Sequence, residues 1–170
     1  MSKLKYFKIV FSLLLGVYFL HYAYYAKDID NWNIIDSVDL IFHEAGHMIF
    51  IFFGEFMHVL GGSLFQIFFP IVFVLYFLIW RRELFSASIL LFWVGQNIIN
   101  VSVYIGDSIR QELPLLGGDG AIHDWNYLLS TTGLLKYTEV FSTITYDLGF
   151  FVVIIASVLS LYFAIYSEPT

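Results

Sequence analysis

The sequence of 170 residues contains no cysteine, so disulfide bonds and thiolate metal ligands are both excluded. Charged residues are also scarce, at 13% of the total, against about one quarter in a typical soluble domain. Basic residues are the scarcer kind, and a net charge of −6 argues against a surface that binds nucleic acid. Hydrophobic residues make up 59% of the sequence, which indicates an integral membrane protein in contact with the lipid bilayer.

The hydrophobic residues are gathered into segments long enough to form membrane helices. These segments cover residues 7–26, 35–53, 63–80, 86–105 and 146–166, and a shorter apolar piece covers 125–135. We therefore expect an all-α membrane protein, a polytopic helical bundle of about five to six transmembrane segments. The length suits a single domain over residues 1–170. The first segment begins like a signal peptide, but it is a full span without a small-residue cleavage site, so we expect an uncleaved helix.

Basic residues give conflicting indications about orientation in the membrane. Both the lysines at positions 3, 5 and 8 and the pair Arg81–Arg82 should lie on the cytoplasmic side. Simple alternation of the segments instead places them on opposite sides, unless one apolar segment fails to cross. The glycine-containing stretch 54–70 is a candidate for irregular backbone that lines a cavity, and a plain interfacial loop is the alternative.

The pentapeptide His43-Glu44-Ala45-Gly46-His47, in the second segment, carries the clearest chemistry. Histidines four residues apart on a helix project from one face, so both imidazoles can bind one metal ion. Glu44 can then act as general base on a water that the metal holds. Without cysteine, the ligands must be histidine and carboxylate, which suits zinc and leaves iron or manganese open. The alternative is a structural pair of histidines with Glu44 as ion-pair partner, but ionisable groups are costly inside a membrane and favour function.

A catalytic zinc ion usually has three protein ligands and a water, so one more ligand is expected. In the glycine-containing stretch 113–125, the triplet His123-Asp124-Trp125 begins an apolar piece in the manner of a helix start. We expect Asp124 or His123 to be the third metal ligand, with its neighbour orienting it. Asp119 is the remaining candidate. A helix cap is the structural alternative for Asp124.

The fourth segment carries polar residues at three- and four-residue spacing, which places them on one helix face inside the bundle. They are Asn97, Asn100, Tyr104 and Asp107. Hydrogen bonds between helices are the favoured interpretation of the two asparagines, and substrate binding is the alternative. Asp107, at the segment end, is expected to be solvated. His21 and His58 are expected to be buried or interfacial residues rather than ligands.

Taken together, these residues resemble the site-2 protease family of intramembrane zinc metalloproteases. In that family the third ligand is an aspartate of an Asn-x-x-Pro…Asp-Gly motif. Here Gln111-Glu112-Leu113-Pro114 precedes Asp119-Gly120 at the same spacing, with Gln111 in place of Asn. The stretch 111–115 and the triplet at 123–125 resemble a signature of a small bacterial branch. The resemblance covers roughly residues 36–129, and its specific part is His43–His47.

The resemblance implies a membrane-embedded zinc metallopeptidase of the bacterial inner membrane, with His43 and His47 on zinc and Glu44 as base. The expected function is hydrolysis of peptide bonds in a membrane protein or membrane-associated peptide. The alternative is a non-peptidase that binds a metal or a partner protein on a protease-like fold. Glu44 favours the hydrolase, because a structural or transport site needs no base. The five histidines are too few for the histidine boxes of a di-iron membrane oxygenase.

Overall fold

The structure is a computed structural model that describes residues 3–28, 33–113 and 123–166. Within these ranges the chain is helical and contains no strand, so the expected all-α fold is confirmed. The long elements are α1 (Lys3–Tyr25), α2 (Ile34–Phe50), α3 (Glu55–Leu75), α4 (Leu84–Gly106) and α6 (Thr138–Tyr166). The short ones are η1 (Ile51–Phe53), the π-helical turn η2 (Tyr76–Arg81), α5 (Asp124–Thr131) and η4 (Leu135–Tyr137).

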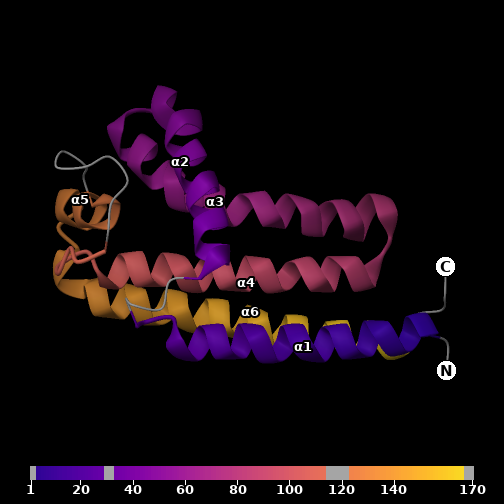
Figure 1. Cartoon of the computed structure of the whole chain (residues 1–170). Coiled ribbons are helices and arrows are strands. Elements are labelled where there is room, and N and C mark those ends of the chain that lie inside the picture. The colour runs from indigo at the N-terminus through magenta and orange to yellow at the C-terminus, as the bar shows by residue number, and fades with distance from the viewer. Residues whose placement is uncertain (1–2, 29–32, 114–122, 167–170) are drawn as a thin grey trace.

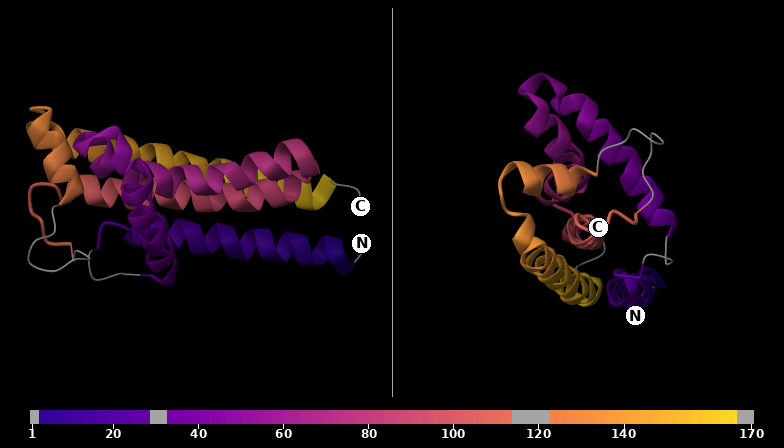
Figure 2. Two further views of the ribbon diagram at one scale, coloured as in Figure 1. Left: turned by 90° about the horizontal axis from the view of Figure 1, so that it is seen from above. Right: turned by 90° about the vertical axis from the view of Figure 1, so that its left-hand side faces the viewer.

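Four helices are long and apolar enough to cross a membrane: α1, α3 with η2, α4, and α6 with η4. They lie along a common axis, whereas α2 runs across them near one end of the bundle (Figures 1 and 2). α2 has 17 residues, fewer than the roughly 20 that a membrane helix needs. α5, with eight residues, is shorter still. The described helices therefore supply four candidate spans, fewer than the five to six expected from the sequence.

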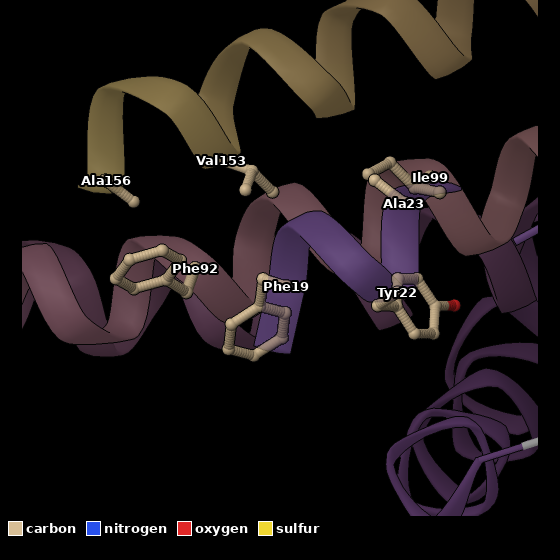
Figure 3. Packing of buried hydrophobic residues seen from close by; sticks show 7 residues of the cluster. All are labelled: Phe19, Tyr22, Ala23, Phe92, Ile99, Val153 and Ala156. Atoms are coloured by element: carbon tan, nitrogen blue, oxygen red, sulfur yellow. The ribbon is translucent and has the colours of Figure 1, made fainter. Parts of the chain in front are cut away.

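α4 lies at the centre of the bundle and packs against α1 and α6 through a buried apolar cluster. Its members, shown in Figure 3, are Phe19, Tyr22, Ala23, Phe92, Ile99, Val153 and Ala156. The rings of Phe19 and Phe92 stack with centroids 5.3 Å apart. Small residues bring α4 and α6 close, since a Cβ added to Gly149 would lie 2.8 Å from the carbonyl oxygen of Gly95. The long helices thus form a framework on which α2 and α5 are placed.

The arrangement of the helices resolves the conflict over which side of the membrane the two groups of basic residues occupy. The Nζ atom of Lys8, on α1, lies 4.9 Å from the ring centroid of Phe85, which closely follows the pair Arg81–Arg82. Both groups of basic residues therefore lie at the same end of the bundle, where α1 begins and α6 ends (Figure 1). Because α2 does not run along the bundle, only α1 and α3 separate the two groups, and alternation returns the chain to its starting side.

The expectation of irregular backbone or a loop over residues 54–70 is wrong. Only Gly54, with a φ of 90°, interrupts the chain there, and α3 is continuous from Glu55. The later glycines serve close packing. A Cβ on Gly61 would lie 2.8 Å from the carbonyl oxygen of Gly46 on α2, so the two helices cross almost backbone to backbone. This crossing brings α3 against the histidine face of α2.

Candidate metal centre

Two helices far apart in the sequence meet at the pentapeptide. His43 and His47 lie one turn apart on α2, with ring centroids 4.8 Å apart. Asp124 is the first residue of α5, and its Oδ2 atom lies 2.8 Å from Nε2 of His43 and 3.2 Å from Nε2 of His47. The three ligand atoms lie within 4.8 Å of one another, and no other such group of three occurs in the part of the chain that the structure describes.

Side chains beside Asp124 hold α5 in this position. Trp125 donates a hydrogen bond from Nε1 to Oγ of Ser63 on α3, at 3.0 Å. Asn126 donates from Nδ2 to the carbonyl oxygen of Ser108, at 2.7 Å, just beyond the end of α4. The start of α5 is therefore tied to two of the long helices, and the Asp124 carboxylate is directed at the two imidazoles.

A hydrogen bond to the backbone orients His47. Its Nδ1 donates to the carbonyl oxygen of His58 at 2.9 Å, and Nδ1 of His58 donates to the carbonyl oxygen of His47 at 2.8 Å. A carbonyl oxygen only accepts, so Nδ1 of His47 carries the proton and Nε2 presents a lone pair. On the other ring, Nδ1 of His43 lies 3.1 Å from Oε1 of Gln66, an acceptor as well.

The site therefore brings together three atoms that donate electron pairs. Nε2 of His43, Nε2 of His47 and Oδ2 of Asp124 can converge only around a positive charge, either a proton or a metal ion. Burial raises the pKa of Asp124, but hydrogen bonding to the two histidines outweighs burial and lowers this pKa below its ordinary value. Two imidazoles and one carboxylate form a donor set that suits zinc.

The third ionisable side chain of the pentapeptide belongs to Glu44. Glu44 is exposed and makes no hydrogen bond or ion pair to a described residue. Glu44 follows His43 directly on α2, so its carboxylate starts from the same helix turn as the histidines without being one of the three converging atoms. The ring of Tyr104 stacks on His43 with centroids 5.6 Å apart. Glu44 is thus placed to exchange protons with a molecule at the site.

Among the candidates for third ligand, Asp124 is the residue that the structure brings to the histidines of α2. His123 is not in this group, because its Nδ1 lies 3.7 Å from Oδ2 of Asp107. Asp107 is 2% exposed and accepts hydrogen bonds from the backbone N–H groups of Glu112 and Leu113, both at 3.0 Å. The expectation that Asp107 is solvated is therefore wrong, since it fixes the turn after α4. Asp119 lies outside the described residues, as does Pro114 of the Gln111–Pro114 stretch.

Both asparagines of α4 are buried, but only Asn100 makes the hydrogen bonds between helices that the structural interpretation expects. Asn100 bonds with α2 and α3, whereas Asn97 donates to the carbonyl oxygen of Trp93 on its own helix. His21 is exposed on α1 and lies against the ring of Tyr25, at 4.6 Å between centroids.

Sequence reasoning missed two residues that bond to the histidines, His58 and Gln66, and a third, Asp36, whose buried carboxylate accepts a hydrogen bond from Asn100. Asp36 shares a helix face with His43, seven residues later, so its position on the inner face could be recognised from spacing. Gln66 is a polar residue in a strongly apolar segment, which is itself a signal. The role of His58 depends on its backbone carbonyl, and no residue pattern indicates that.

The chain was compared with protein-family models, curated proteins and solved structures, and none of these comparisons gave a match.

Proposed function

We propose that this protein is an intramembrane zinc metalloprotease that hydrolyses peptide bonds of membrane-associated substrates in a bacterial inner membrane. The observation that carries the proposal is the convergence of His43, His47 and Asp124, with Glu44 beside them. Four helices able to span a membrane support the membrane setting.

His43, His47 and Asp124 would hold the zinc ion and leave a further position for water or substrate. Zinc bound there supplies a Lewis acid, which polarises the scissile carbonyl and lowers the pKa of water. The close approach of α3 supports the fit, because a Cβ on Gly62 would lie 2.7 Å from Nε2 of both histidines. The space beside the two nitrogens is thus kept free of side-chain atoms from that residue.

Glu44 has the role of general base. It accepts a proton from the attacking water and then delivers that proton to the leaving amine. Its exposure and its lack of a hydrogen-bond partner among the described residues support this role, since a carboxylate fixed in an ion pair would be less available. A site that only stores or transports a metal has no use for such a group.

The test compares wild type with Glu44→Gln. Glu55→Gln is the matched control, because Glu55 is also exposed but does not belong to the group of His43, His47 and Asp124. Zinc content is measured on purified protein, and cleavage is measured with a library of internally quenched apolar peptides. We expect Glu44→Gln to keep its zinc and to lose about 10²- to 10⁴-fold in cleavage rate. Glu55→Gln should match wild type in both.

Cleavage by Glu44→Gln at the wild-type rate would contradict the proposed mechanism. A wild-type protein that holds zinc but cleaves no peptide of the library, and no co-expressed membrane protein, would favour a metal-binding function without hydrolysis.

A further inference from the structure

We propose that Asp36 is a positioning residue of the metal centre, which acts on His43 through two buried amide side chains, Asn100 and Gln66. We call Asp36, Asn100 and Gln66 the Asp36 relay. The inference rests on the metal site of the proposed function, but it does not depend on peptide hydrolysis.

The Asp36 relay is an unbroken series of hydrogen bonds across three helices. Asn100 on α4 donates from Nδ2 to Oδ1 of Asp36 on α2, at 3.1 Å. Gln66 on α3 donates from Nε2 to Oδ1 of Asn100, at 2.7 Å, and its Oε1 lies 3.1 Å from Nδ1 of His43. The three relay side chains and His43 are each at most 7% exposed, so water does not compete for these hydrogen bonds.

The carboxylate at one end sets the direction of every bond. An ionised carboxylate only accepts, so Asn100 must turn its NH₂ group to Asp36 and its Oδ1 to Gln66. Gln66 then donates to Asn100 and presents Oε1 to His43, whose Nδ1 must carry the proton. Reversing one amide would place two donors or two acceptors face to face in a buried site. The remaining nitrogen of His43, Nε2, is therefore fixed as the metal ligand.

Asp36 also has a structural role, because it forms a capping box with Asn33 at the start of α2, but that role does not require a charged side chain. Asp36 accepts four hydrogen bonds, from the hydroxyl of Tyr22, the amides of Gln96 and Asn100, and the backbone N–H of Asn33. All four donors are neutral, and Asp36 has no basic partner among the described side chains. Its negative charge is costly to bury, and among the described residues only neutral donors and the positive end of the α2 helix dipole compensate it. That charge instead favours a cation at the far end of the relay, as carboxylates behind metal-binding histidines do.

Asp39 provides a matched control on the same helix. It is 0% exposed, and its Oδ1 accepts a hydrogen bond from Nε1 of Trp93 at 2.8 Å. Its Oδ2 has no hydrogen-bond partner among the described residues, and Asp39 is not hydrogen-bonded to His43. Replacing Asp39 by Asn thus removes an equivalent buried carboxylate from the same helix and leaves the hydrogen bonds of the Asp36 relay in place.

The test measures the zinc dissociation constant of the detergent-solubilised full chain by competition with a chromophoric chelator. We expect Asp36→Asn to weaken zinc binding by about 10- to 100-fold, and Asp39→Asn to stay within about twofold of wild type. Unchanged binding in Asp36→Asn, or an equal loss in both variants, would overturn the relay. The second outcome would mean that any buried charge on α2 has the same effect.

Two further variants keep the test decisive. Adding Gln66→Glu to Asp36→Asn moves the carboxylate next to His43, so zinc binding should recover to within about threefold of wild type. A structural defect would not be rescued in this way. If Asp36→Asn does not fold, Gln66→Met removes the acceptor for His43 with little change of shape, and it should show the same loss. Wild-type zinc affinity in Gln66→Met would overturn the proposal.

Failure of this inference can be told apart from failure of the proposed function. Zinc affinity that responds to Asp36 in a protein without peptidase activity would support the relay and contradict the protease. Wild-type protein that binds no zinc would overturn both.

Discussion

Oδ2 of Asp124 lies 2.8 Å from Nε2 of His43, although the two residues are 81 positions apart in the sequence. The contact joins a helix that crosses the bundle, α2, to a short helix beyond the end of α4. It turns a pair of histidines into a set of three side chains that could hold a metal ion.

The first prediction distinguishes Asp124 from its neighbour His123. Asp124→Ala removes an oxygen from between two imidazoles, so the purified variant should lose most of its zinc. His123→Ala should keep the wild-type zinc content, because the His123 ring faces Asp107 at 3.7 Å instead of the histidines of α2. Metal analysis by mass spectrometry checks both variants. Full zinc in Asp124→Ala, or zinc loss confined to His123→Ala, would show that the third ligand is assigned wrongly.

The second prediction concerns the space that Gly62 leaves beside the imidazoles. In Gly62→Ala the added Cβ would lie 2.7 Å from Nε2 of His43 and of His47, so the rings must move. We expect loss of zinc binding while the helical circular-dichroism signal is retained, since alanine favours the helix by about 1 kcal/mol over glycine. Gly16→Ala is the control, because its Cβ would make an ordinary contact of 3.5 Å with Ser157. Equal zinc affinity in the two variants would count against the described geometry.

The third prediction concerns orientation in the membrane. Five of the eight basic residues lie at the end of the bundle opposite the metal centre (Figure 1), and this bias predicts that this end faces the cytoplasm. They are Lys3, Lys5, Lys8, Arg81 and Arg82. The metal centre should therefore face the outer side of the membrane, and substrates should present their scissile bonds there.

Because the chain has no cysteine, single-cysteine variants report orientation without background. Thr131 is the exposed last residue of α5, the helix that begins with Asp124, so Thr131→Cys should react with a membrane-impermeant maleimide on intact cells. Glu83→Cys, beside the arginine pair, should react only after the membrane is permeabilised. The reverse pattern would invert the orientation, and labelling of both from one side would contradict the arrangement of α3 and α4.

Part of this molecule could be predicted from the sequence. Apolar length indicated the helices now seen as α1, α3, α4 and α6, since burial in lipid imposes a minimum length and few charges. The segment over residues 35–53 is long and apolar enough to suggest another span. Its helix ends at Phe50, however, and its direction depends on how Gly46 packs against Gly61. Contacts of that kind are formed between segments, so neither segment reveals them alone.

The candidate site, too, could be predicted only in part from the sequence. Spacing on one helix predicted that His43 and His47 share a face, because that depends only on helical geometry. The proximity of Asp124 required the fold, since it depends on Trp125 and Asn126 anchoring α5 to other helices. The Asp36 relay depends on three helices meeting, which residue patterns do not specify.

The most direct test of the account is the zinc content and coordination of the purified wild-type protein, measured by metal analysis and X-ray absorption. We expect about one zinc ion per chain, with two imidazoles and oxygen ligands at about 2.0–2.2 Å and with no sulfur. Correctly folded protein that takes up no zinc, or zinc whose imidazole signal persists in the double variant His43→Ala/His47→Ala, would contradict the central claim.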